Sequence, residues 1–154
     1  DLPVSLTWAY QRPLGTMIYL SESVRTGLED RGLGWQAAAR ANLVEAGQRQ
    51  LWSHEFRSDS GKLEGVAMMH DDGMGPSRLY CLQLLREQFT DHFDWYIPER
   101  SCALLLATSA GAEIRAKVER VVGGCYESAD VPMSAAPFAS HALAAALAAA
   151  GEGA

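Results

Sequence analysis

The sequence predicts a single α+β domain with a mixed or mainly antiparallel sheet and helices packed mainly on one face. Segments typical of strands come in pairs, and segments with helical periodicity separate the pairs. The 154 residues are 48% hydrophobic and 21% charged, which is ordinary for one globular domain with its own core. The predicted order is ββ-α-ββ-α-β-α followed by an irregular tail.

The first strand pair and the first helix are predicted near the N-terminus. Residues 4–10 alternate between large apolar and smaller side chains, residues 11–15 hold Pro and Gly at turn spacing, and residues 16–20 return as a second strand. Ser21 is suited to cap a helix that runs to Gly47. Glycines within 31–34 interrupt its pattern, so we expect one helix in two pieces.

A second strand pair covers Leu51–Arg57 and Leu63–His70, because residues 58–61 read Ser-Asp-Ser-Gly, a strong turn signal. The stretch 66–69 is continuously apolar, which indicates a central strand covered on both faces. Pro76 then fits the first position of a second helix, whose apolar face includes Cys81, Leu85 and Phe89.

A buried strand is predicted at Ser101–Thr108, where residues 103–107 are apolar throughout, and Pro98 must lie before it or at an edge. A third helix follows, capped by Ser109 and ended by Gly123-Gly124.

The C-terminal part of the chain carries weaker signals. Residues 130–138 are expected to be extended or irregular. The domain is therefore drawn as 1–140, followed by an Ala-rich tail at 141–154 in which Leu143 and Leu147, four residues apart, are compatible with a short helix.

Charge and composition narrow the class of function. The 19 acidic residues outnumber the 13 basic ones, for a net charge of −6, and the basic residues are scattered, so no nucleic-acid partner is expected. No apolar run reaches the ~18 residues of a membrane span, and no signal peptide is visible, so we expect a cytoplasmic protein. Three cysteines without a C-x-x-C pair indicate reduced, buried thiols, and no motif for a cofactor is present.

The loop at 70–78 is the densest polar cluster, and it lies between a strand and a helix. His70, Asp71 and Asp72 are chemically suitable ligands for a divalent metal, together with His54 or His92. The alternative is an Asp-Gly turn with solvated carboxylates.

A second hypothesis for this loop is an anion site. A helix beginning after two glycines offers backbone N–H groups, and Ser77, Arg78 and Arg100 would add donors. We predict that at least one of the two arginines pairs with a carboxylate of the 70–76 loop or with Glu99. Such a pair has a structural reading, pinning the loop, and a functional one, anion binding.

Trp95 and Tyr96 precede the predicted buried strand and stand close to Glu99 and Arg100. Aromatic residues and Arg are enriched at interfaces, so this segment is a candidate binding edge; it is equally compatible with a strand entrance.

Four short motifs in order resemble the DUF1444, or YtpQ-like, family of bacterial proteins of unknown function. They are Ala-Asn-Leu at 41–43, Pro-Ser-Arg-Leu at 76–79, Ile-Pro-Glu-Arg at 97–100, and Val-Pro-Met-Ser at 131–134. The resemblance spans most of residues 4–140 and implies the later part of a longer family protein. The family pattern places Asp after the Arg, where this chain has Ser101. The resemblance implies a shape and positions, not a reaction.

We therefore expect a non-enzymatic bacterial cytoplasmic interaction module with an unknown protein partner and no cofactor. The alternative is a small ligand- or metal-binding enzyme that uses the 70–78 loop, with His70, Asp71 and Asp72 as acid–base or metal groups.

Overall fold

A five-stranded antiparallel sheet forms the centre of the protein. The structure, a computed structural model, describes residues 9–11, 17–32, 34–72 and 74–152. The sheet order is β3-β4-β6-β5-β7, and every neighbouring pair is antiparallel. These strands are β3 (His54–Arg57), β4 (Leu63–Met68), β5 (Phe93–Glu99), β6 (Cys102–Ala107) and β7 (Pro132–Ala139). The α+β class and the mainly antiparallel sheet are confirmed.

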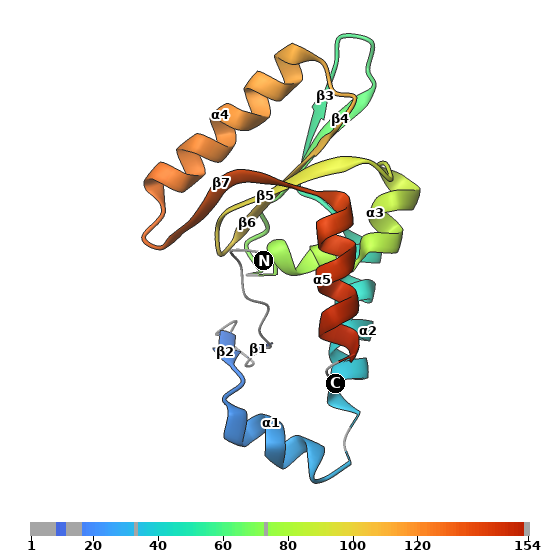
Figure 1. The fold of residues 1–154 in the computed structure, drawn as a ribbon, viewed down its shortest axis with the longest axis vertical. Helices are drawn as coiled ribbons and strands as arrows, with labels where there is room; N and C mark the ends of the chain where they lie inside the picture. The colour runs from blue at the N-terminus through green and yellow to red at the C-terminus, as the bar shows by residue number, and fades with distance from the viewer. Residues whose placement is uncertain (1–8, 12–16, 33, 73, 153–154) are drawn as a thin grey trace.

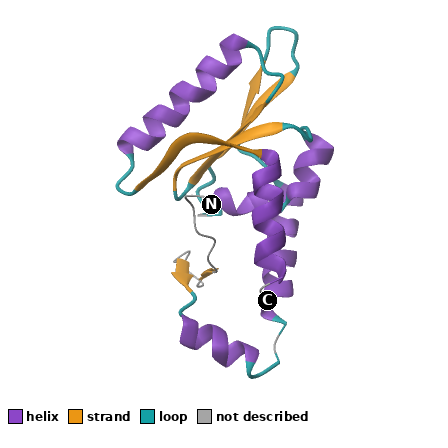
Figure 2. Cartoon of the chain, viewed as in Figure 1, coloured by secondary structure: helices purple, strands orange, loops and turns teal. Residues whose placement is uncertain are grey.

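Helices lie on both sides of this sheet (Figures 1 and 2). One face is covered by α4 (Ala112–Ser128). The 3₁₀-helix η1 (Pro76–Tyr80), α3 (Leu82–Gln88) and α5 (Ser140–Glu152) contribute to the core on the other face, and α2 (Trp35–Arg49) packs on η1. Most of the helices that contact the sheet thus share one face, as expected, while α4 is the one described helix on the opposite face.

Strand β6 shows why both faces must be covered. All six of its side chains are buried, and successive residues belong to different cores: Leu105 packs in the core with α3 and α5, whereas Leu104 and Leu106 pack against α4. Its neighbour β4 lies in register with Val66 opposite Leu105. A continuous apolar run is the pattern of a strand buried on both sides, so the predictions for 63–70 and 101–108 are confirmed.

The N-terminal elements are also close to the prediction. β1 (Ala9–Gln11) pairs with β2 (Met17–Tyr19), while residues 4–8 of the first predicted strand and residues 12–15 of the expected turn lie outside the described residues. The first helix is in two pieces, α1 (Glu22–Glu29) and α2, and Ser21 Oγ accepts the N–H of Val24 at 3.4 Å. α1 has no buried residue and lies with β1 and β2 away from the sheet (Figure 1).

The segment before β6 is itself a strand, which the sequence order missed. β5 occupies an interior position between β6 and β7, and Pro98 lies within it. Pro98 does lie before the buried strand β6, as expected, but it lies inside a further interior strand that the sequence did not predict. The pairing of β5 with β6 shifts register between Tyr96 and Glu99, and this irregularity accommodates a residue that donates no ladder hydrogen bond.

Helix α4 differs from its predicted limits at both ends. It begins at Ala112, with Gly111 as N-cap, and it continues through Gly123 and Gly124 to Ser128. A glycine inside a helix costs only about 1 kcal/mol. The apolar face of α4, formed by Ile114, Val118 and Val122, is continued beyond the glycines by Cys125, which packs against the same core and offsets that cost.

Residues 132–152, the last that the structure describes, form a strand and a helix. Residues 132–139 form β7, which pairs with β5, and the Ala-rich segment folds as α5. Leu143 of α5 is buried in the core, and Leu147 packs against it.

Two other elements differ from their predicted limits. The predicted helix from Pro76 is divided at Cys81 into η1 and α3, and the strand expected from Leu51 begins at His54.

Candidate functional site

The 70–78 loop is held by a buried arginine. Arg78 lies on η1 with only 4% of its side chain exposed. Its Nη2 and Nη1 donate to Asp72 Oδ2 and Oδ1 at 2.7 and 3.1 Å, and its Nε donates to the backbone oxygen of Gln50 at 3.0 Å. This bidentate ion pair confirms the prediction that at least one of the two arginines pairs with a carboxylate of the loop.

Asp72 is fully engaged in this arrangement. Its Oδ1 also accepts the backbone N–H of Met74 at 2.9 Å. Burial acts to raise the pKa of Asp72, but the hydrogen bonds from Arg78 and Met74 outweigh it and hold that pKa below its usual value. The carboxylate is thus ionised near neutral pH and serves to close the loop onto η1.

His70 lies near this pair and, unlike Asp72, has no hydrogen-bond partner among the described residues. Its two ring nitrogens are buried. Burial lowers the pKa of His70, the positive charge of Arg78 lowers it further, and Asp72 acts in the opposite direction. The imidazole is therefore kept neutral at physiological pH.

Gly75 ties the loop to the turn between β5 and β6. A Cβ at this position would lie 2.5 Å from the backbone oxygen of Met68 and closer still to that of Ser101. The close approach requires glycine, and it brings the predicted anion loop next to the predicted strand entrance.

The expected metal set does not form. Within the described part of the chain, no three His, Cys, Asp or Glu side chains are grouped to hold a metal ion. The reason is local: Asp72 is turned onto Arg78, while Asp71 is exposed. The hypothesis of a metal held by His70, Asp71 and Asp72 is corrected accordingly.

The two arginines have different surroundings. Arg100 is exposed at the turn after β5, and no ion pair joins it to a carboxylate of the described residues. Glu99 instead accepts the N–H of Ser101 at 3.1 Å and its hydroxyl. Ser77 is half-buried on η1. Anion binding by Ser77, Arg78 and Arg100 stays a prediction, with most of the Arg78 guanidinium already occupied.

Trp95 and Tyr96 are core residues, with exposed fractions of 1% and 2%. They point to opposite faces of β5, so each is covered by a different layer of helices. Trp95 Nε1 donates to the backbone oxygen of Ala139 at 3.1 Å. The hypothesis that they form a binding edge is wrong, because the sheet is buried on both sides at this strand.

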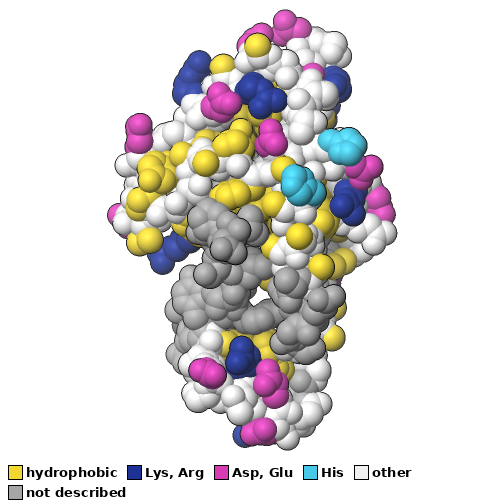
Figure 3. Space-filling view, viewed as in Figure 1, with side chains coloured by type: hydrophobic (Ala, Val, Ile, Leu, Met, Phe, Trp, Pro, Cys, Tyr) yellow, Lys and Arg dark blue, Asp and Glu magenta, His cyan; other side chains and the backbone are white. Residues whose placement is uncertain are grey.

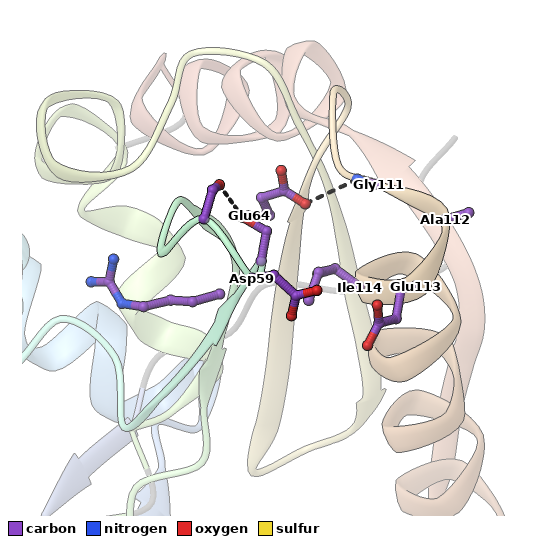
Figure 4. Close-up of a pocket in the computed structure, with 9 residues that line it drawn as sticks. Asp59, Glu64, Gly111, Ala112, Glu113 and Ile114 are labelled. Atoms are coloured by element: carbon purple, nitrogen blue, oxygen red, sulfur yellow. Dashed lines mark hydrogen bonds between the residues drawn. The ribbon is translucent and has the colours of Figure 1, made fainter.

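A cavity of about 290 Å³ lies between the β3–β4 turn and the start of α4 (Figure 4). The turn residues 57–60 line one side, residues 111–114 line the other, and Glu64 of β4 stands between them. Asp59, Glu64 and Glu113 place three carboxylates around this space against the single guanidinium of Arg57. The cavity therefore favours a small cationic or amine-bearing ligand over an anion.

Glu64 occupies the middle of this site, and the sequence singled out neither it nor any other residue that lines the cavity as functional. Its side chain is 9% exposed, its Oε2 accepts the N–H of Gly111 at 2.9 Å, and its Oε1 lies 3.7 Å from Lys62 Nζ. A carboxylate at a helix N-terminus satisfies a free N–H group and interacts favourably with the helix dipole. Glu64 therefore caps α4 from a neighbouring strand, in the role that was predicted for Ser109.

A smaller cavity, of about 220 Å³, lies between α2, η1 and α5 and is lined by Arg40, Val44, Tyr80 and Leu147. Burial raises the pKa of Tyr80, and the charge of Arg40 opposes that shift. The phenol therefore stays protonated near neutral pH.

Comparison with family models, with curated proteins and with solved structures finds no match to this chain. Membership of the DUF1444 family stays a prediction. None of the helices in the described residues has the length and apolar character that crossing a bilayer demands.

Proposed function

We propose that the protein is a non-enzymatic interaction module of the bacterial cytoplasm and that it binds a protein partner through the corner between α4 and β7. The observation that carries the proposal is the exposure of Tyr126, Val131 and Met133, at 38%, 63% and 37%. They are half of the six large hydrophobic side chains that are exposed among the residues whose burial the structure describes (20–32, 34–72 and 74–148), and they lie within eight residues of chain. Clustered exposed apolar side chains are typical of protein-binding surfaces.

The surroundings of this corner support the same proposal. Hydrophobic side chains gather on the side of the molecule formed by α4 and β7 (Figure 3). Glu127 and Asp130 are exposed between the apolar residues. Charge complementarity therefore favours a partner with an apolar segment flanked by Lys or Arg. A nucleic-acid partner is disfavoured by the same acidic character.

The edge of β7 is not the expected mode of contact. β7 carries prolines at 132 and 137, and its pairing with β5 shifts register between Trp95 and Ile97. Prolines and bulges are the features by which sheet edges avoid pairing with another chain. Contact through side chains of the corner is the better supported mode.

Affinity capture with matched variants tests the proposal. The double variant Val131→Asp, Met133→Asp should lose the proteins that the parent chain retains, because charges in an apolar contact are costly to desolvate. Val24→Asp places the same charge on an exposed valine of α1 and should retain them. Identical sets of captured proteins for the parent and both variants would contradict the proposal.

A second candidate function, binding of a small ligand, is supported by the carboxylate-lined cavity at the start of α4 and not by the 70–78 loop. A thermal-shift screen with amines and divalent cations tests it, since a specific ligand raises the melting temperature. The shift should disappear in Asp59→Asn, Glu113→Gln and persist in Asp71→Asn, whose carboxylate lies outside the cavity. A shift that is equal in all these variants would exclude the cavity as its origin.

A further inference from the structure

Two of the three cysteines lie next to each other although they are far apart in sequence. Cys102 begins β6, and Cys125 lies in the last turns of α4. The thiol of Cys102 donates to the sulfur of Cys125, with the two Sγ atoms 3.8 Å apart. Cys81 packs in the core on the other face of the sheet, where its thiol donates to the backbone oxygen of Leu43 at 3.4 Å.

We propose that Cys102 and Cys125 are a modification site that forms an intramolecular disulfide on reaction with a peroxide. The proposal is independent of the protein-binding function. A disulfide has an S–S bond of about 2.05 Å, so the two sulfurs need to approach by about 1.8 Å. The residues before Cys125 are Gly123 and Gly124, whose Cβ positions would meet nothing within 4 Å, so the helix has room to adjust at this point.

The accessibility of the two thiols sets the order of the reaction. Cys125 is half-buried, whereas Cys102 is 1% exposed, so the peroxide reaches Cys125 first. The sulfur of Cys125 attacks one peroxide oxygen; the S–O bond forms, the O–O bond breaks, and the departing hydroxide takes the thiol proton to give water. Cys125 is then a sulfenic acid.

The second step closes the disulfide. The sulfur of Cys102 attacks the sulfenic sulfur, the S–S bond forms, and the S–O bond breaks, so that a second water leaves with the proton of Cys102. The two thiols together give two electrons to one peroxide. Burial raises the pKa of Cys102, and the neighbouring Cys125 raises it further, so this step is slow and the sulfenic acid should accumulate before it.

The site tolerates the bond because of where its two ends lie. Both cysteines belong to the packing between α4 and the sheet, Cys102 within the core and Cys125 against it. The disulfide therefore links elements that are already in contact. It also fixes the C-terminal end of α4, which carries Tyr126 of the corner between α4 and β7.

Peptide mapping of the reduced full chain after treatment with hydrogen peroxide tests the proposal. Free thiols are blocked under denaturing conditions, and the protein is cleaved after Lys and Arg. Because Arg115, Lys117 and Arg120 lie between the two cysteines, residues 101–115 should be recovered linked to residues 121–154. Two of the three thiols should disappear, Cys81 should remain free, and dimedone added early should label Cys125.

Matched variants separate this pair from general oxidation. Cys125→Ser should abolish the linked peptides, and Cys81→Ser should leave them unchanged. Retention of all three thiols, a disulfide that includes Cys81, one that joins two chains, or oxidation of Cys125 to the sulfinic acid alone would each overturn the proposal. The mapping of the unmodified sequence decides by itself, so the result does not depend on how well the Ser variants fold.

Discussion

The ion pair between Asp72 and Arg78 should make a measurable contribution to the free energy of unfolding. Removing its charge leaves a guanidinium that is 4% exposed without its anionic partner. We expect Asp72→Asn to lower the free energy of unfolding at pH 7 by about 2 kcal/mol. Asp71→Asn, at the exposed neighbouring position, should change it by less than about 0.5 kcal/mol. Urea unfolding measures both, and equal stabilities of the two variants would show that the pair contributes little.

The same pair has a defined pH dependence. The pKa of Asp72 is lowered in the folded state from its ordinary value of 3.8, so the folded carboxylate binds a proton less readily than the unfolded one. Its stabilisation is fully present above pH 3.8 and is lost as the pH falls through the lower folded-state pKa. The difference in stability between the parent chain and Asp72→Asn should therefore be constant from pH 7 to about pH 4 and shrink below it.

His70 acts in a separate pH range. Its pKa is lowered from 6.5 by burial and by the charge of Arg78, so the folded state resists protonation while the unfolded state accepts it. Stability should therefore fall as the pH drops below 6.5 toward the folded-state pKa, and this slope should be absent in His70→Gln. NMR titration of the histidine ring protons reports the pKa directly, with His70→Gln giving the assignment. A His70 resonance that titrates at or above 6.5 would contradict ring nitrogens that are buried and make no hydrogen bond to any described residue.

At the scale of elements, two glycines should respond in opposite ways to the same substitution. Gly75→Ala places a methyl group against two backbone oxygens, from β4 and from the β5–β6 turn, and should cost more than about 2 kcal/mol. Gly124→Ala lies inside α4 with open space around it and should stabilise the protein by about 0.5–1 kcal/mol. Thermal or urea unfolding compares the two. A destabilising Gly124→Ala would indicate that α4 ends at the glycines after all.

For the whole molecule, stability depends on a sheet that is covered on both faces. Leu105 is fully buried at the centre of β6, so Leu105→Asp puts an unpaired carboxylate in the core. We expect a loss of more than about 4 kcal/mol, which is close to unfolding a domain of ordinary stability. Val131→Asp, at a position that is 63% exposed, is the control and should fold normally by circular dichroism. A soluble, cooperatively unfolding Leu105→Asp with the parent's stability would contradict the central position of β6.

The sequence by itself determined the class of fold and most of its local boundaries. Alternation and short apolar runs located β4 and β6, the Ser-Asp-Ser-Gly turn located the hairpin between β3 and β4, and Ser21 located the start of α1. These features depend on neighbouring residues, whose periodicity is written along the chain. Part of the 70–78 loop was predictable for the same reason, because Asp72 and Arg78 are only six residues apart.

Only the tertiary structure decided the features that depend on distant residues. α4 is capped by Glu64, 47 positions before Gly111 in the chain, and it continues through two glycines because its face packs on the sheet. Pro98 reads locally as a break, yet β5 is an interior strand because both of its neighbours accommodate an irregular register. Trp95 and Tyr96 have the composition of an interface, but they are core residues because helices cover both faces of the sheet. Helix caps, burial and strand order depend on contacts between segments that are distant in the chain, and local sequence patterns do not specify those contacts.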